Sequence, residues 1–269
     1  MKISFSTLGC PEWSWQEIIV AAKDLGYDGI ELRGIASEMY VPRAHPFTPQ
    51  NIEHTKKLLT EKGLEISCVT SSCYLYEENT EKYLREGKEY IDIAQKLDSP
   101  YIRVLGDREP YPGEHIAHDR VKAMLDELGE YGVDKGVMVL IETNGVYADS
   151  KVLLKLMQSL DSNNVGVLWD IHHPYRYIGE KVEDTYNRLK KYIRYVHVKD
   201  SIEKDGKVIY CLLGQGDVPV KEAISILKNN AYEGYISLEW VRRWYYELED
   251  PGIAFPHFIH TIKRIISEV

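Results

Sequence analysis

Short β-forming runs alternate with longer helical patterns from one end of the chain to the other, and this alternation limits the possible folds most. The strand candidates are residues 3–8, 29–33, 64–71, 101–106, 137–142, 165–170, 193–199 and 235–240. Helical periodicity lies between them, as at 14–26 and 48–63, and both of these stretches end on a glycine, as helix C-termini often do. Eight strand-and-helix units of roughly 34 residues each match a (β/α)8 barrel.

The main alternative fold is a doubly wound open sheet. That fold more often has a glycine-rich phosphate turn after its first strand, and residues 6–15 contain no such motif. No low-complexity linker divides the chain. We therefore predict an α/β protein with a single domain, residues 1–269, folded as a (β/α)8 TIM barrel.

Composition limits the partners. The formal net charge of −9 argues against nucleic-acid binding, which depends on clustered Lys and Arg, and is compatible with a small metabolite. The four cysteines form no CxxC pair, which favours a reducing cytoplasm. No stretch approaches the roughly 20 apolar residues of a membrane helix, and the first residues lack a signal-peptide pattern. We expect a cytoplasmic protein without nucleic-acid or membrane partners.

Ionisable residues follow the apolar parts of four successive predicted strands. These residues are Glu142, Asp170, His197 and Glu239. In a barrel the C-terminal ends of the strands share one mouth, so the four side chains are expected to meet. Any one of them alone is more simply a solvated or core residue, but three adjacent carboxylates need a cation to remain ionised. Three oxygen donors and one imidazole suit Mn²⁺, Mg²⁺ or Co²⁺, with Zn²⁺ also feasible.

The sequence resembles the xylose-isomerase-like TIM barrel superfamily, which contains sugar and sugar phosphate isomerases and epimerases. The resemblance covers essentially the whole chain and depends on Glu142 in "IETN", Asp170 and His173 in "WDIHH", His197 in "HVKD" and Glu239 in "SLEW". It implies that Glu142, Asp170, His197 and Glu239 bind one divalent metal ion, for which we expect Mn²⁺. It also implies acid/base roles for Glu142 and Glu239, and substrate contacts for His173, Arg103 and Lys199.

The expected activity is that of a metal-dependent isomerase or epimerase of a sugar, sugar phosphate or keto-polyol. The metal would stabilise an enediolate formed when Glu142 or Glu239 removes a carbon-bound proton. Return of a proton to the opposite face gives an epimer, and return to the neighbouring carbon exchanges aldose and ketose. Arg103 and Lys199 have simpler alternative roles, Lys199 pairing with Asp200 and Arg103 with an acid inside the barrel.

The sequence also supports predictions for the second strand, for two long loops and for the aromatic residues around the substrate. Glu31 and Arg33 lie on one face of the second strand, and we interpret them first as a buried structural pair, with substrate contact as the alternative. Two long loops, 34–49 and 201–219, are expected at the barrel mouth, the second with a hairpin at its Asp-Gly pair. The candidate apolar walls of the substrate site are Trp13, Tyr40, Tyr210 and Trp240.

Three other functions remain open. A dehydratase acting on inosose or 3-dehydroshikimate begins with the same proton abstraction. The dehydroshikimate enzymes usually have a histidine two residues after the first metal-binding glutamate, where this chain has Asn144. A DNA repair endonuclease of the same superfamily needs additional histidines, and residues 67–74 and 103–110 contain none. A non-catalytic sugar-binding barrel is the third possibility, and a homo-oligomer is compatible with all of them.

Overall fold

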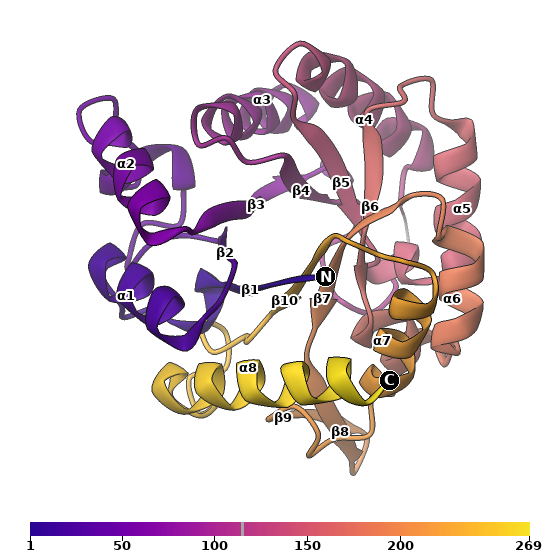
Figure 1. Ribbon diagram of the computed structural model, residues 1–269. Helices are drawn as coiled ribbons and strands as arrows, with labels where there is room; N and C mark the ends of the chain where they lie inside the picture. Colours follow the sequence, from indigo (N-terminus) through magenta and orange to yellow (C-terminus); the bar gives the residue numbers. More distant parts are fainter. Residues whose placement is uncertain (114–115) are drawn as a thin grey trace.

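All eight predicted strands are present in the computed structural model, which describes residues 1–113 and 116–269. The barrel strands are β1 (Lys2–Ser6), β2 (Gly29–Leu32), β3 (Glu65–Tyr74), β4 (Tyr101–Leu105), β5 (Met138–Glu142), β6 (Val165–Asp170), β7 (Ile193–Val198) and β10 (Tyr235–Leu238). They pair in parallel and close into a ring in the order β1-β10-β7-β6-β5-β4-β3-β2 (Figure 1). The predicted (β/α)8 barrel is confirmed. The main difference is β3, which continues to Tyr74 rather than ending near residue 71.

Helices surround the ring (Figure 1). The α-helices are α1 (Trp15–Leu25), α2 (Ile52–Lys62), α3 (Thr80–Lys96), α4 (His118–Val133), α5 (Ser150–Ser159), α6 (Val182–Leu189), α7 (Val220–Asn229) and α8 (Pro251–Glu268). Short 3-10 helices lie at Thr7–Gly9, Val41–Arg43, His45–Phe47 and Gly145–Ala148, and a short π-helix at Pro174–Ile178. Within the described ranges, no helix combines the length and apolar character needed to cross a membrane.

Local sequence sets the ends of these helices. At the start of α1, the Ser14 side chain accepts from the Glu17 amide, and the Glu17 side chain accepts in return from the Ser14 amide. This reciprocal cap satisfies donors that the first turn of a helix leaves free. Gly26 ends α1 with φ at 75°, in the left-handed region that glycine adopts without strain. The short αβ loop that follows leads directly into β2.

Inside the ring of strands, five buried side chains form a small cluster that is separate from the larger core between strands and helices. Its members are Cys68, Leu140, Leu168, Tyr195 and Tyr235. The Tyr195 hydroxyl lies 2.9 Å from the Ser4 hydroxyl and 2.8 Å from the Ser67 hydroxyl. The phenol is therefore buried with hydrogen-bond partners, which avoids the cost of an unpaired polar group.

This inner layer determines where the ionisable residues point. Side chains alternate between the two faces of a strand, so the residue two positions after an inward side chain also faces inward. Leu140 precedes Glu142 in this way, Leu168 precedes Asp170, Tyr195 precedes His197, and Ser237 precedes Glu239. The strand registers agree, because Leu168 pairs with Tyr195 and Asp170 with His197. The barrel therefore carries its polar layer directly above its apolar one.

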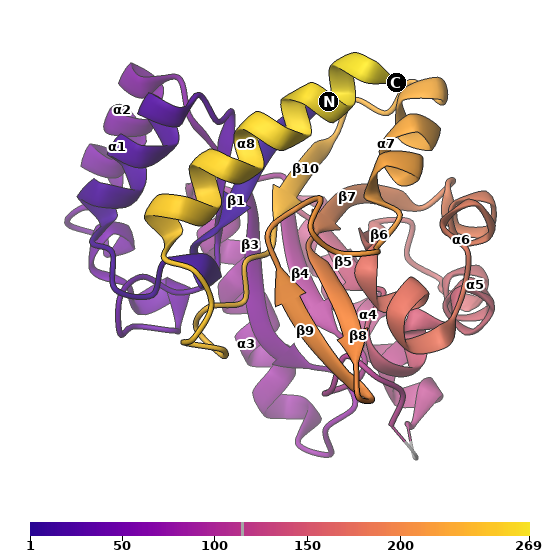
Figure 2. The same cartoon turned by 90° about the horizontal axis from the view of Figure 1, so that it is seen from below.

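The predicted hairpin after β7 is also present, as β8 (Asp200–Lys204) and β9 (Lys207–Cys211). Asp205 and Gly206 both have positive φ, as the two central residues of a type I′ hairpin turn require. At the base of the hairpin, the Asp200 carboxylate accepts backbone N–H groups of Ser201, Gly214 and Gly216. Figure 2 shows the hairpin extending away from the chain termini, toward the end of the barrel where the strands finish.

Truncation of the inner apolar layer tests this architecture. We expect Leu168→Ala to lower the free energy of unfolding by about 2–5 kcal/mol, because it leaves a cavity that packed neighbours cannot fill. The matched control is Ile253→Ala at an exposed site on α8, which should change stability by less than about 0.5 kcal/mol. Denaturant unfolding followed by circular dichroism measures both, and equal effects would contradict the assignment of Leu168 to the core.

Candidate active site

Four acidic and histidine side chains meet at the mouth of the barrel. Glu142, Asp170, His173 and Glu239 each place a potential ligand atom within 4.8 Å of those of the others. All four residues are buried. They come from the ends of β5, β6 and β10 and from the segment after β6. The structure thus brings together three carboxylates that the sequence analysis expected to converge.

The fourth predicted ligand, His197 on β7, points its Nδ1 atom at the same carboxylates. Nδ1 lies 3.5 Å from Glu239 Oε1, 3.7 Å from Glu142 Oε1 and 3.9 Å from Asp170 Oδ2. This buried nitrogen has no hydrogen-bond partner among the described residues. Ligands held about 2.1 Å from one tetrahedral ion lie roughly 3.4 Å from each other, which is close to the observed spacings. The donor set and its geometry fit a divalent metal ion.

Glu31 orients the His197 ring. The His197 Nε2 atom lies 3.0 Å from Glu31 Oε2, which also accepts from the Tyr195 hydroxyl at 3.1 Å. When Nε2–H donates to this carboxylate, the Nδ1 lone pair is directed at the acidic cluster, as in other carboxylate–histidine–metal arrangements. The expected structural pair of Glu31 with Arg33 is wrong, because the partners of the Glu31 carboxylate are His197 and Tyr195.

Two buried cations neutralise the carboxylates. Arg103 Nε lies 3.1 Å from Glu142 Oε2, and its Nη1 donates to the Ser71 carbonyl at 3.0 Å. The Lys199 ammonium contacts both Asp170 and Glu239. Arg103 therefore pairs with an acid of the barrel interior while it lines the mouth. Lys199 does not pair with Asp200, whose carboxylate instead accepts backbone amides of the hairpin loop.

The electrostatics follow from these contacts. Burial alone would raise the pKa of Glu142, but Arg103 and His197 outweigh burial and lower it to about 2. Burial would likewise lower the pKa of His197, but the carboxylates of Glu31, Glu239 and Glu142 outweigh it and raise that pKa. These shifts favour an ionised Glu142 carboxylate beside a positively charged His197 ring. A divalent cation that coordinates Nδ1 supplies that positive charge in place of the imidazolium proton.

His173 faces the cluster, whereas its neighbour His172 contacts the hairpin. The His173 Nδ1 atom lies 3.0 Å from the Thr143 carbonyl, so Nδ1 is the ring nitrogen that carries the proton. This leaves His173 Nε2, 3.5 Å from Asp170 Oδ2, available toward the cavity. The His172 Nε2 atom lies 2.8 Å from the Ser201 hydroxyl. His172 is not among the described residues that line the cavity.

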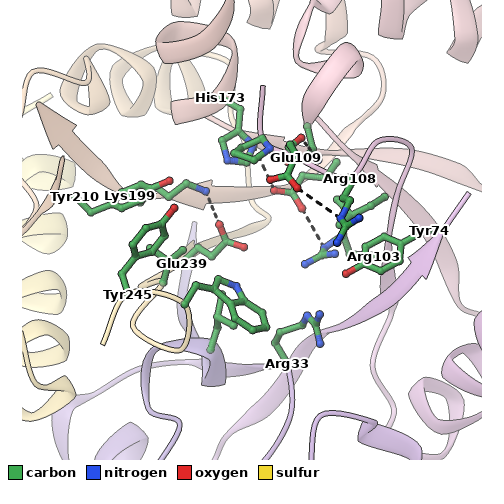
Figure 3. A pocket seen from close by; sticks show the side chains of 17 residues that line it. Arg33, Tyr74, Arg103, Arg108, Glu109, His173, Lys199, Tyr210, Glu239 and Tyr245 are labelled. Atoms are coloured by element: carbon green, nitrogen blue, oxygen red, sulfur yellow. Dashed lines mark hydrogen bonds and ion pairs between the residues drawn. The ribbon is translucent and has the colours of Figure 1, made fainter. Parts of the chain in front are cut away.

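A cavity of about 420 Å³ opens above the acidic cluster (Figure 3). Its lining includes the predicted residues Glu142, His173, Arg103, Lys199, Glu239 and Tyr210. It also includes groups that the sequence analysis did not single out, namely Leu8, Tyr74, Leu105, Arg108, Glu109, Pro110, Val241, Trp244 and Tyr245. Arg33, assigned first to a structural pair, lines the cavity as well.

Three aromatic residues that were predicted to form walls of the substrate site lie away from the cavity. Trp13 packs edge-on against Phe255 of α8, with ring centroids 5.5 Å apart. Trp240 is buried, and its indole N–H donates to the Glu249 carbonyl. The Tyr40 hydroxyl donates to Glu89. None of the three is among the described residues that line the cavity, so Trp13 and Trp240, which were predicted to contact the substrate, lie outside it.

The lining aromatic residues that the sequence analysis missed lie at or beyond the ends of two barrel strands. Tyr74 ends the long strand β3, and Trp244 and Tyr245 lie in the loop between β10 and α8. The dense aromatic and arginine content of "WVRRWYYELED" was the available signal for that loop. Asn144 also lines the cavity and donates to the backbone carbonyls of Asp107 and Glu109, which fixes the loop after β4 against β5.

Comparison with known protein families gives a match over most of the chain. Residues 19–256 match the sequence profile of a family described as xylose isomerase-like TIM barrel. Fructoselysine 3-epimerase of Escherichia coli O157:H7 is 25% identical over an alignment of 287 positions that covers 100% of this chain and 99% of the relative. Inosose dehydratase of Clostridium perfringens strain 13 is 26% identical, with 82% of each protein covered.

Solved structures share the fold. The crystal structure of IOLI protein with a bound zinc atom superposes with a TM-score of 0.81 at 17% sequence identity. The superposition covers 100% of this chain and 99% of that protein. At this identity the likeness establishes a common fold rather than a common activity.

Removal of the Glu31 carboxylate tests its role behind His197. We expect Glu31→Gln to weaken Mn²⁺ binding about 10-fold or more, because partners that orient a histidine ligand contribute to metal affinity. Competition with a chelating dye measures this affinity without any substrate. Glu183→Gln, at an exposed position on α6, is the matched control and should bind as tightly as the unmodified protein. Unchanged Mn²⁺ affinity in Glu31→Gln would show that Glu31 does not contribute to metal binding through His197.

Proposed function

The chain belongs to the xylose isomerase-like TIM barrel family, and on that premise we propose that it is a divalent-metal-dependent isomerase or epimerase of a sugar, sugar phosphate or keto-polyol. The observation that carries the proposal is the group of three buried carboxylates, Glu142, Asp170 and Glu239, around the unpartnered Nδ1 of His197. A relative that covers nearly the full length is an epimerase of a modified ketose. Together they support proton transfer beside a carbonyl group.

The proposed ligands of the ion are Glu142, Asp170, His197 and Glu239. Three oxygen donors and one nitrogen favour Mn²⁺, with Mg²⁺, Co²⁺ and Zn²⁺ as alternatives. A bound zinc in a structure of the same fold supports a single-ion site. When bound, the ion supplies Lewis acidity that polarises a substrate carbonyl and balances the negative charge formed on its oxygen.

Glu142 and Glu239 are the proposed acid/base groups. They approach the cluster from β5 and from the end of β10, which are separated in the ring by β6 and β7. Arg103 keeps Glu142 ionised, and Lys199 does the same for Glu239, so either carboxylate is in the form that accepts a proton. One carboxylate removes the proton from the carbon beside the carbonyl, and the other, once it has taken up a proton from water, delivers that proton to the opposite face. This exchange of protons inverts the carbon centre.

Other lining residues hold the substrate. His173 Nε2 is placed to accept a hydrogen bond from a substrate hydroxyl, since its Nδ1 donates to the Thr143 carbonyl. Tyr210 on the hairpin and Tyr245 on the loop after β10 have ring centroids 5.2 Å apart and form an aromatic wall over the mouth. Such a wall excludes water from the reacting carbon, which strengthens the electrostatic interactions within the site.

A dehydratase is the second candidate. The match to an inosose dehydratase over 82% of the chain supports it, and dehydration beside a carbonyl begins with the same proton removal. The reactions diverge afterwards, because a dehydratase protonates a substrate hydroxyl group, which then leaves as water. Asn144, at the position where the dehydroshikimate enzymes usually carry histidine, uses its amide to hold the loop after β4. We therefore rank the isomerase or epimerase first.

The cellular setting is proposed from the composition and thiols. All four cysteines are free, which favours a reducing cytoplasm. The net charge of −9 favours a small carbohydrate or keto-polyol over nucleic acid as the partner. We further infer that residues 1–269 form one domain, because barrel elements extend from Lys2 to Glu268.

Substitution of the proposed acid/base groups tests the activity. We expect Glu142→Gln and Glu239→Gln each to slow metal-dependent exchange of solvent deuterium into a ketose substrate by at least about 100-fold, as removal of a general acid or base does. The assay incubates Mg²⁺- or Mn²⁺-loaded protein with ketoses, keto-polyols and 3-dehydroshikimate, followed by proton NMR after the metal is chelated. An accumulating epimer or aldose identifies an isomerase, and loss of water identifies a dehydratase.

The matched control is Glu53→Gln, at an exposed position on α2, which should exchange at the rate of the unmodified protein. A chelated sample should show no exchange. Full activity in either glutamine variant of the site would refute the assignment of that glutamate.

A further inference from the structure

Arg33 differs from the other cations that line the cavity, because it has no acidic partner among the described residues. Lys199 contacts Asp170 and Glu239, and Arg103 pairs with Glu142. The exposed Arg108 lies 3.6 Å from the Glu109 carboxylate. Arg33 is only 6% exposed, and its Nη1 atom is buried without a hydrogen-bond partner in the described part of the chain.

The backbone that carries Arg33 is held rigidly. The Arg33 amide donates to the Thr7 hydroxyl at 2.8 Å, and that hydroxyl donates to the Gly34 carbonyl at 2.7 Å. The guanidinium carbon lies 6.0 Å from the centre of the Trp244 ring. Figure 3 shows the Arg33 side chain directed into the cavity from the side opposite His173. The unpartnered guanidinium is therefore presented to whatever occupies the cavity.

The ring order divides the mouth into two halves. Strands β5, β6, β7 and β10 are consecutive in the ring and carry the acidic cluster, whereas β4, β3, β2 and β1 form the other half. Arg103 lies on β4, Tyr74 ends β3 and Arg33 follows β2. Because neighbouring strands are about 4.8 Å apart, a ligand that reaches from Glu239 past β1 to Arg33 spans about 10 Å. A chain of five or six carbons with a terminal charged group has this length.

A buried guanidinium without a counter-ion is unfavourable. Burial lowers the pKa of Arg33 and the nearby Arg103 lowers it further, while Tyr90, Tyr74 and Glu239 only partly offset these effects. Removal of a charge from water is costly unless the charge is paired and hydrogen-bonded. Arg presents donors that match a carboxylate or phosphate in a two-pronged contact. An anionic group on the ligand supplies the missing partner.

We propose that Arg33 binds an anionic group, a phosphate or a carboxylate, at the end of the substrate remote from the reacting carbon, so that the substrate is an acidic ketose rather than a neutral sugar. The identification of the ligand as the substrate rests on the proposed function. The presence of an anion site at Arg33 does not depend on the proposed function, and anion binding can be measured separately.

Calorimetric titration of the Mg²⁺-loaded protein with sodium sulfate and with sodium acetate tests the anion site directly. Sulfate represents a phosphate group and acetate a carboxylate, so the anion that binds identifies the source of the charge. We expect at least one of them to bind, and Arg33→Gln to weaken this binding about 10- to 100-fold, the loss typical of charge-assisted hydrogen bonds. Arg264→Gln, at an exposed position on α8, is the matched control and should bind normally.

Two results would overturn the anion site. One is the absence of binding of either anion to the unmodified protein, and the other is equal binding by Arg33→Gln. Arg33→Lys guards against a folding defect, because it retains the charge without the two-pronged contact. This variant should bind more weakly than the unmodified protein and more tightly than Arg33→Gln.

Deuterium exchange into matched ketoses then tests the substrate class. D-fructose, D-fructose 6-phosphate and 5-keto-D-gluconate differ in the charge at one end. We expect Arg33→Gln to lower kcat/KM about 10- to 100-fold for the charged ketose that reacts, with a change of less than about threefold for the neutral one. Equal loss for charged and neutral ketoses would contradict the proposal while the proposed function stands. Exchange into none of these ketoses or the wider panel, together with Arg33-dependent anion binding, would leave the anion site and refute the function.

Discussion

The arrangement of the whole site depends on the cost of holding three carboxylates together inside a protein. Glu142, Asp170 and Glu239 lie within a few ångströms of each other and are buried, where like charges repel strongly and water does not screen them. The chain balances them with three groups, His197, Arg103 and Lys199, each in contact with at least one of the acids. Buried charged groups of this kind are often less stable than apolar packing of similar volume, so their presence points to a function. A divalent ion is the simplest ligand that it fits.

The barrel supplies the rigidity that this balance requires. An apolar layer of Leu140, Leu168 and Tyr195 fills the interior, and the strand alternation places an acidic or histidine residue two positions later on the same face. The Tyr195 hydroxyl contacts Glu31, and Glu31 contacts His197. The packing layer and the proposed metal-binding layer are therefore joined by a chain of hydrogen bonds. This connection fixes the direction of the His197 ring.

The mouth combines this acidic half with a second half that carries positive charge. Arg33 follows β2 and Arg103 lies on β4, two strands that do not contribute to the acidic cluster. One half is suited to chemistry at a carbonyl and the other to recognition of a remote charge. Binding energy gained far from the reacting atoms can position a substrate for reaction, and this gives a physical reason for a buried arginine outside the acidic cluster.

The sequence predicted the barrel well because strand periodicity is a local property. It also predicted that the side chains of Glu142, Asp170, His197 and Glu239 meet at the mouth, since each follows an apolar run at a strand end. It failed for Trp13 and Trp240, because the side of a loop on which an aromatic ring packs depends on distant partners such as Phe255. It also missed the contact between Glu31 and His197, which joins residues 166 positions apart. Pairings of this kind depend on the closed ring rather than on any local pattern.

Anomalous diffraction from a crystal of the Mn²⁺-loaded protein tests the central claim most directly. The account predicts a single strong peak about 2.2 Å from one oxygen each of Glu142, Asp170 and Glu239 and from Nδ1 of His197. It also predicts that the Lys199 ammonium moves away from at least one of its two carboxylate partners. A map without a peak at this point, or with His197 turned so that Nε2 faces the cluster, would contradict the account.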